Sequence, residues 1–361
     1  MARRVFLHVG APKTGTTYLQ STFARNRTLL ADHGLTYPDT AAGTHFEAAI
    51  DLIDHPWGGR LRHARGEWQK LAAAAVRAPG DALISHEVLA AATAENVRRA
   101  QESLAGAELH VVLTARDLGR QIPAEWQEKV KHRGRMGFKK FLHSVVQGPR
   151  SAATQWFWRV QSVPDVLGRW SAGLTPSQVH LVTVPPTRDD PELLLRRFLS
   201  VMGLDPSLAL EPGDHDNPSL GIAEVSLLRR LNVALRGRAI PQPVYAEIVR
   251  DLLARDTLGH RDEQLRATLP PESRDFVEQV TGEWVEWVEG SGIDVVGDLG
   301  ELATRWPPTP EEGGEPWVDP DRPRPARIID AGVDGLAALV ELEAARYREQ
   351  ANAGLWRRLN R

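Results

Sequence analysis

The loop Gly10–Thr17, with the sequence GAPKTGTT, constrains this chain more than any other feature. It follows the short apolar run Val5–Val9, which predicts a buried strand, and leads into the periodic segment Thr16–Leu30, which predicts a helix. A strand, a tight Gly/Pro loop and a helix in this order gather backbone N–H groups and a helix N-terminus around one small volume. That volume favours phosphate or sulfate, because the N–H groups lack intrahelical partners and the helix dipole attracts an anion.

The rest of the chain alternates in the same way between short apolar runs and longer periodic segments. Strands alternating with helices predict an α/β fold with a central parallel sheet and right-handed crossovers. The predicted strands are Val5–Val9, Ala82–Ser85, Leu109–Ala115 and Val179–Val184. The predicted helices include Thr16–Leu30, Trp68–Val76, Glu87–Leu104, Lys139–Val146, Ser162–Ala172 and Glu192–Met202, and a helical pattern runs from Ile240 to Val288.

The composition changes near the end of the chain and indicates three parts. We predict an α/β domain over residues 1–300 and an extended, proline-rich linker over residues 301–327. A C-terminal amphipathic helix is predicted over residues 328–361, where apolar residues from Val333 to Tyr347 have helical spacing. This helix either packs back on the core or pairs with a second copy of the chain in a homodimer.

The composition also argues against several classes of function. A net charge of −3 over 361 residues gives no basic field for nucleic acid. The absence of cysteine excludes disulfides and thiolate metal sites. No apolar stretch reaches the length of a membrane span or a secretory signal. We expect a cytoplasmic protein that binds neither nucleic acid nor a membrane.

The loop differs from the common nucleoside-triphosphate loop, G-x-x-x-x-G-K-[ST]. Gly10 and Gly15 have the right spacing, but Thr16 occupies the lysine position and the lysine lies three residues earlier, at Lys13. The later strand that would supply a metal-binding carboxylate offers Asp117 only after an intervening arginine. A triphosphate held by a metal ion is therefore disfavoured.

The segment Pro12–Tyr18 closely resembles the 5′-phosphosulfate loop of sulfotransferases that use 3′-phosphoadenosine 5′-phosphosulfate (PAPS), which reads PK[ST]GTT followed by an aromatic residue. Seven consecutive positions agree, including the displaced lysine. The resemblance implies a P-loop NTPase-like α/β fold, PAPS as donor, adenosine 3′,5′-bisphosphate (PAP) as product and no metal requirement. The alternative is a Gly/Pro turn before a helix, with Lys13 merely solvated.

Ligands of open α/β sheets bind beyond the carboxyl ends of the strands, where this loop lies. Sulfuryl transfer needs groups that hold the donor oxygens and that neutralise charge on the departing 5′-phosphate. The N–H groups of Gly15, Thr16 and Thr17 suit the first role, and the ammonium group of Lys13 suits the second. The predicted donor-binding residues are Pro12, Lys13, Thr14, Gly15, Thr16, Thr17, Arg116 and Gln121.

A base must also take a proton from the acceptor. Sulfotransferases carry a His or a Glu after the second strand, and this chain offers His86 and Glu87 side by side. Adjacent residues of an extended segment face opposite ways, so only one of them can point at the donor. We favour Glu87. The alternative is that His86 is a core histidine and Glu87 a charge in the first turn of a helix.

Arg116 resembles the arginine that binds the 3′-phosphate in this family, at the end of the third strand. A guanidinium group offers a planar fork to a phosphate. The family then expects a serine eight residues later, where this chain has Ala124. Gln121 or Gln127 is a candidate substitute for that donor. The alternative for Arg116 is an ion pair with Asp117.

Polar and aromatic residues gather after the third predicted strand, where an acceptor would bind. The alternative interpretation of this stretch is a solvated helix face without a role in binding. For His45, the alternative is an ordinary surface histidine. The candidate acceptor-binding residues are His45, Trp126, Gln127, Lys131 and His132.

The sequence therefore predicts a PAPS-dependent sulfotransferase that acts on a hydroxyl or amine of a small-molecule or carbohydrate acceptor. Two rivals stay open: an atypical P-loop kinase of small molecules, and a catalytically inactive nucleotide-binding module that assembles through its C-terminal helix. The missing serine at Ala124 and the long C-terminal segment keep the second rival in view.

Overall fold

The structure is a computed structural model that describes residues 2–39, 44–150, 152–187, 189–213 and 218–359. The chain forms two compact units, each built from three segments. The first unit contains Met1–Ile122, Leu142–Asp216 and Leu269–Gly314, and the second contains Pro123–Phe141, Asn217–Thr268 and Glu315–Arg361. The predicted division at residues 300 and 327 follows chain order instead, and it stays a prediction.

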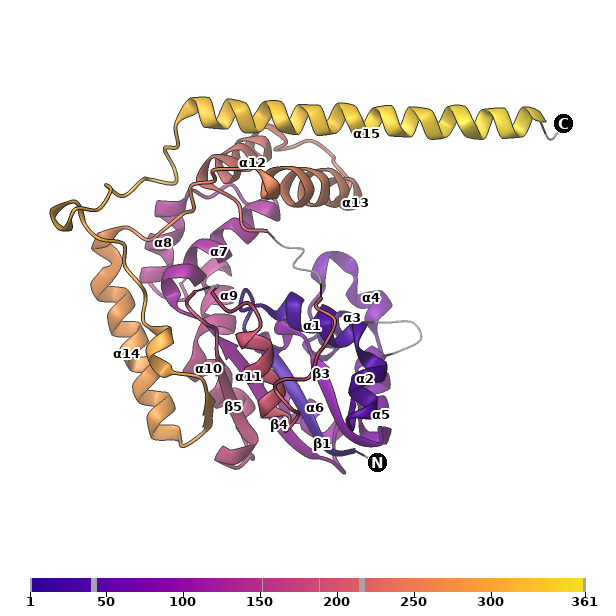
Figure 1. Ribbon diagram of the computed structural model, residues 1–361, viewed down its shortest axis with the longest axis vertical. Coiled ribbons are helices and arrows are strands. Elements are labelled where there is room, and N and C mark those ends of the chain that lie inside the picture. The colour runs from indigo at the N-terminus through magenta and orange to yellow at the C-terminus, as the bar shows by residue number, and fades with distance from the viewer. Residues whose placement is uncertain (1, 40–43, 151, 188, 214–217, 360–361) are drawn as a thin grey trace. The chain divides into compact units, whose positions relative to one another are not determined.

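The first unit is built on a parallel sheet of six strands in the order β2-β3-β1-β4-β5-β6 (Figure 1). The predicted α/β fold is therefore confirmed, and β1 lies in the middle of the sheet as in P-loop folds. The sequence missed two edge strands, which are only two and three residues long. The strands are β1 (Ala2–Gly10), β2 (Leu35–Thr36), β3 (Gly80–Ser85), β4 (Glu108–Ala115), β5 (Val179–Thr183) and β6 (Asp294–Val296).

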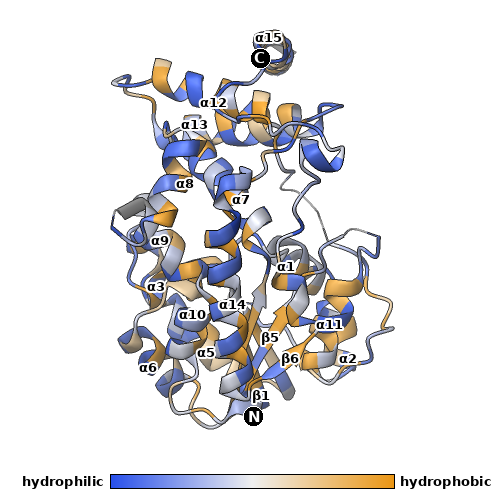
Figure 2. Cartoon of the chain, turned by 90° about the vertical axis from the view of Figure 1, so that its left-hand side faces the viewer, coloured by the Kyte–Doolittle hydropathy of each residue, from blue (hydrophilic) through white to orange (hydrophobic). Residues whose placement is uncertain are grey.

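Helices cover the sheet and bury its apolar side chains. One cluster packs α1, α2 and α11 on side chains of the central strands, such as Phe6 and Val112, which are fully buried. Figure 2 shows the orange, apolar colour along the strands, between the helices. The helices of this unit are α1 (Thr16–Arg25), α2 (Arg27–Asp32), α3 (His45–Leu52), α4 (Leu61–Ala64), α5 (Glu67–Arg77), α6 (Ala94–Ser103), α9 (Ala152–Gln161), α10 (Val163–Trp170), α11 (Leu193–Val201) and α14 (Arg274–Ser291).

Two predicted helices are shorter than the sequence pattern indicated. The first is broken at Asn26, between α1 and α2, and the side-chain amide of Asn26 donates to the carbonyl groups of Thr22 and Glu211. The predicted helix Glu87–Leu104 was wrong as a single element, because Glu87–Ala91 forms a 3₁₀ turn before α6 begins. Side-chain hydrogen bonds to the backbone compete with the helical ladder, which is why both breaks fall at polar residues that apolar periodicity does not register.

The second unit is helical. The helices α7 (Leu118–Lys131) and α8 (Phe138–Val146) each belong partly to both units, and α12 (Ile222–Ala234), α13 (Gln242–Tyr245), the π-helix Ala246–Thr257 and α15 (Pro325–Leu359) complete this one. The predicted helical pattern from Ile240 to Val288 is interrupted between His260 and Pro271.

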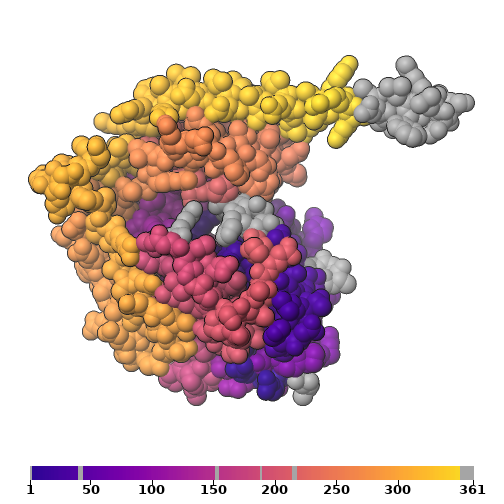
Figure 3. Space-filling model, viewed as in Figure 1, coloured from indigo at the N-terminus to yellow at the C-terminus, as the bar shows by residue number. Residues whose placement is uncertain are grey.

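The C-terminal helix α15 packs on α12 and on the π-helix within the second unit, as the yellow and orange atoms of Figure 3 show. Its outer face carries a row of exposed apolar side chains, namely Ile329, Val333, Leu336, Val340 and Tyr347. Homodimer formation through this helix stays a prediction. None of the helices in the described part of the chain is both long and apolar enough to cross a membrane.

Candidate functional site

The loop between β1 and α1 turns on three residues with positive φ: Gly10 (120°), Lys13 (67°) and Gly15 (87°). A Cβ atom on Gly10 would lie 3.1 Å from the carbonyl oxygen of Glu87, so glycine lets the end of β1 pass close to that residue. Gly15 is the N-cap of α1 and, as a glycine, supplies no side-chain cap to the helix. Helix α1 therefore begins with N–H groups that no N-cap side chain satisfies, an arrangement that suits an anion.

The side chains of the loop divide into buried and accessible ones. Thr14 and Thr16 are buried, with 1% and 3% of their surface exposed. Lys13 is half-buried, whereas Gly15 and Thr17 are exposed. The lysine and the start of α1 therefore lie at the surface of the first unit, where a ligand can reach them.

Arg116 follows β4 and lies against the loop, as the chain order predicted. Its Nη1 atom donates to the carbonyl oxygen of Lys13 at 3.1 Å. The expected alternative partner, Asp117, forms an ion pair with Arg120. The arginine is thus placed beside the loop by a backbone contact, and its role toward a 3′-phosphate stays a prediction.

Gln121 on α7 also contacts the loop, through its amide. It is 1% exposed, and its Nε2 atom donates to the carbonyl oxygen of Pro12 and to Oε1 of Gln161, the latter at 2.6 Å. These are contacts with the protein, and direct binding of the nucleotide by Gln121 stays a prediction. Ala124, where the resemblance to sulfotransferases predicts a serine, lies on the same helix in the second unit and carries no side-chain donor.

His86 and Glu87 follow β3 and face different neighbours. His86 accepts a hydrogen bond from the backbone N–H of Val88 at 3.2 Å, and its ring lies 5.2 Å from the ring of Phe46. Glu87 accepts a hydrogen bond from the side-chain amide of Gln20 on α1, at 2.9 Å. Glu87 is therefore tied to the helix that the loop begins, whereas His86 caps its own turn.

The pKa of Glu87 lies below its ordinary value. Burial alone would raise this pKa, but the charge of His86, the hydrogen bond from Gln20, a hydrogen bond from the backbone N–H of Glu87 itself and the charge of Lys13 together outweigh burial. The carboxylate is consequently ionised at neutral pH and lies within electrostatic reach of the Lys13 ammonium group. An ionised carboxylate can accept a proton without first losing one.

A buried polar network lies beneath the loop. His8 on β1 contacts Ser85 on β3 through Nδ1 (2.7 Å) and Thr114 on β4 through Nε2 (3.3 Å). The hydroxyl oxygen of Thr114 in turn lies 2.5 Å from that of Thr14 in the loop. Because burial lowers the pKa of His8 to about 4, this ring is neutral and uses one nitrogen as donor and the other as acceptor. The network fixes the base of the loop to three strands.

His45 belongs to the same buried region. Its Nδ1 atom accepts from the backbone N–H of Ser85 at 3.1 Å, its Nε2 atom donates to the carbonyl oxygen of Pro38 at 2.8 Å, and the residue is 7% exposed. Both ring nitrogens thus bond to the protein backbone. Acceptor binding by His45 stays a prediction.

The remaining candidate acceptor residues lie in the second unit and bond within it. Trp126 is 1% exposed and donates to the carbonyl oxygen of Met136 at 2.9 Å. Gln127 pairs with the backbone of Leu220, Lys131 donates to the carbonyl oxygen of Pro218, and the exposed His132 contacts Glu128. Acceptor binding by all four residues stays a prediction.

Folding stability is expected to fall as the pH drops from 6.5 to 4. Burial lowers the pKa values of His8 and His45 to about 4, so both stay neutral in the folded protein while their unfolded forms take up a proton below about pH 6.5. The unfolded state therefore binds more protons in this window, which costs roughly 1.4 kcal/mol per pH unit for each histidine. Urea unfolding between pH 7 and pH 5 measures this slope.

The matched controls for this experiment are two single variants. His45→Gln should flatten the slope, whereas replacement of the exposed His63 by glutamine should leave it unchanged. An equal slope in wild type and His45→Gln would show that this histidine titrates normally in the folded state.

Sequence reasoning missed several residues of this site. Gln20 had a weak signal, since it follows Thr16 by one helical turn and so lies on the same face of α1. His8, Thr114 and Gln161 had none, because their partners lie 40 to 149 positions away in the chain.

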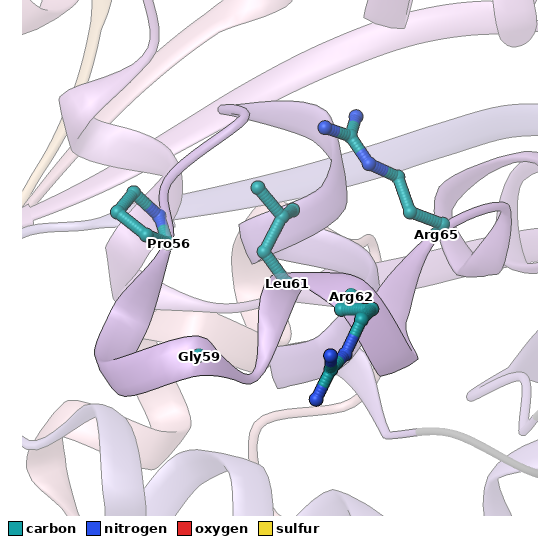
Figure 4. Close-up of a pocket in the computed structure, with 5 residues that line it drawn as sticks. All are labelled: Pro56, Gly59, Leu61, Arg62 and Arg65. Atoms are coloured by element: carbon teal, nitrogen blue, oxygen red, sulfur yellow. The ribbon is translucent and has the colours of Figure 1, made fainter.

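A separate cavity of about 570 Å³ lies in the first unit, at the turn between α3 and α4 (Figure 4). None of the predicted site residues lines it. Arg65, one of its two arginines, is paired with Asp54 at 2.8 Å. The lining residues are Pro56, Gly59, Leu61, Arg62 and Arg65.

Comparisons with known proteins give two distant likenesses. No model of a known protein family matches the chain, and no curated protein matches it. The crystal structure of a sulfotransferase from Alicyclobacillus acidocaldarius is similar, with 16% sequence identity and a TM-score of 0.38, over 68% of this chain and 96% of that chain. The sulfotransferase domain from the curacin biosynthetic pathway is similar with 12% identity and a TM-score of 0.33, over 78% of this chain and 96% of that chain.

Proposed function

We propose that this protein is a sulfotransferase that moves the sulfuryl group of PAPS to a hydroxyl or amine of a small-molecule or carbohydrate acceptor. One observation carries the proposal. Lys13 lies at a left-handed bend in the loop before α1, a helix whose N-cap glycine provides no side-chain cap, and the ionised carboxylate of Glu87 interacts electrostatically with its charge. This pairs a cation for the departing phosphate with a base for the acceptor.

Each residue then has a defined task in the transfer. The N–H groups at the start of α1, from Gly15 to Thr17, hold the oxygens of the phosphosulfate. As the bond from sulfur to the bridging oxygen breaks, negative charge grows on the 5′-phosphate, and the Lys13 ammonium group neutralises it. Glu87 takes the proton from the acceptor as the new bond to sulfur forms. PAP and the sulfated acceptor are the products.

Arg116 is the proposed ligand of the ribose 3′-phosphate. It follows β4 at the edge of the sheet where the loop lies, and its hydrogen bond to the Lys13 carbonyl keeps it there. A guanidinium group binds phosphate through charge-assisted hydrogen bonds. Recognition of this phosphate would distinguish PAPS from adenosine nucleotides that lack it.

Calorimetry with PAP, adenosine 5′-phosphate and ATP tests the proposal. Wild-type protein is expected to bind PAP about 10- to 100-fold more tightly than adenosine 5′-phosphate, because hydrogen bonds to a charged group contribute about 1.5–3 kcal/mol. Arg116→Ala should bind the two ligands equally. Equal affinities in the wild type would remove the proposal.

The same binding measurements, combined with assays of ATP consumption and of sulfuryl transfer, separate the two rival functions. Tighter binding of ATP, with magnesium-dependent consumption of it, would indicate a kinase. Tight binding of PAP without transfer to a broad panel of acceptors would indicate an inactive binding module.

A further inference from the structure

Four consecutive carbonyl groups of the loop, those of residues 10–13, accept hydrogen bonds from side chains. Each acceptor thus points at a donor that belongs to the protein. In order along the loop the donors are Thr114 Oγ1 at 3.0 Å, Thr14 Oγ1 at 2.6 Å, the amides of Gln121 and Gln161, and Arg116 Nη1 at 3.1 Å.

The two glutamines act together on Pro12. Gln121 is 1% exposed and Gln161, the last residue of α9, is 4% exposed. Gln161 donates to the Pro12 carbonyl at 3.2 Å and accepts from Gln121 at 2.6 Å, and Gln121 donates to the same carbonyl. The Oε1 atom of Gln121 is buried with no hydrogen-bond partner in the described part of the chain. If the Gln121 amide were rotated by 180°, its Oε1 atom would face the carbonyl oxygen of Pro12, and two acceptors would meet. The contacts therefore fix the orientation of this amide.

This arrangement has a consequence for the backbone N–H groups. In a trans peptide the C=O and N–H bonds point in opposite directions. The donors that hold the carbonyls of Pro12 and Lys13 therefore turn the N–H groups of Lys13 and Thr14 away from those donors. Carbonyl oxygens carry partial negative charge, so this orientation also keeps them from facing a bound anion.

We propose that Gln161, together with Gln121, is a positioning residue for the anion loop. The pair holds the Pro12 carbonyl so that the N–H groups of the loop converge on the 5′-phosphosulfate of the donor. The effect on the donor rests on the proposed function. The stabilisation of the loop by these two glutamines does not depend on the proposed function, and it can be measured without any ligand.

Amide hydrogen exchange of ligand-free protein tests whether Gln161 stabilises the loop. Gln161→Met keeps the length of the side chain but removes both amide contacts. Exchange of the Ala11 amide, a loop N–H group that donates to the carbonyl oxygen of Thr114 at 2.9 Å, is expected to become roughly tenfold faster. The matched control is Gln178→Met, because the Gln178 amide also donates to a backbone carbonyl, that of Leu109 on β4 at 3.0 Å. If the methionine variant does not fold, Gln161→Asn keeps the amide but is one methylene shorter.

Calorimetry with PAP and steady-state kinetics test the consequence. The Kd for PAP and the KM for the donor should rise about tenfold in Gln161→Met, whereas the KM for the acceptor and both values in Gln178→Met should not change. Equal loop exchange in the two variants would overturn the hold on the loop. Faster exchange without a loss of PAP affinity would overturn the positioning role. A wild type that binds no PAP would refute the proposed function, and the exchange comparison would still decide whether Gln161 holds the loop.

Discussion

Replacement of Lys13 by alanine is expected to lower the rate of sulfuryl transfer by about 100- to 1,000-fold, the usual cost of losing one preorganised electrostatic group from an active site. The ammonium group of Lys13 would act on charge that grows only as the bond to sulfur breaks. The loss should therefore appear in kcat more than in the Kd for PAP. Single-turnover release of PAP measures it.

The fold should survive this substitution. Lysine and alanine both carry a Cβ atom, so the left-handed bend at residue 13 (φ 67°) costs the same in either case. A matched control is Lys70→Ala, since Lys70 is exposed on α5 and pairs only with Glu67 on the same helix among its described contacts. Transfer at the wild-type rate in Lys13→Ala would defeat the role given to the lysine.

Glu87→Gln is expected to lower transfer by about 100- to 10,000-fold, the range attributed to a general base. Glutamine has the same shape and can still accept the hydrogen bond from Gln20, but it cannot take a proton from the acceptor. Initial rates at saturating donor and acceptor measure the loss. Glu95→Gln, on α6 away from the loop, is the control for loss of one negative charge.

The pH profile distinguishes Glu87 from His86 as the base. Because His86, Gln20 and Lys13 hold the pKa of Glu87 below its ordinary value, the rate per folded molecule should stay level on acidification until the pH falls below about 4.5. A histidine base would give a fall near neutral pH. His86→Asn removes one group that lowers the pKa of Glu87, so the acid limb should move to higher pH. Complete loss of transfer in His86→Asn, with activity kept in Glu87→Gln, would reverse the assignment.

The central part of the fold could be predicted because its signals are local. Each of the four central strands is a short apolar run bounded by turn residues, and burial on both faces of a parallel sheet favours that pattern. The edge strands β2 and β6 have two and three residues, too few to form a pattern. The break at Asn26 and the 3₁₀ turn at Glu87–Ala91 depend on individual hydrogen bonds, which apolar periodicity does not contain.

The sequence alone determined that a strand, a loop with an early lysine and a helix follow one another, because neighbours in the chain are neighbours in space. Only the tertiary structure decided what surrounds that loop. Gln20 and Glu87 are 67 positions apart and Gln161 and Pro12 are 149 apart, so no local pattern links either pair. Packing of the strands and helices brings these residues together, and it sets the ionisation of Glu87 and the direction of the loop carbonyls.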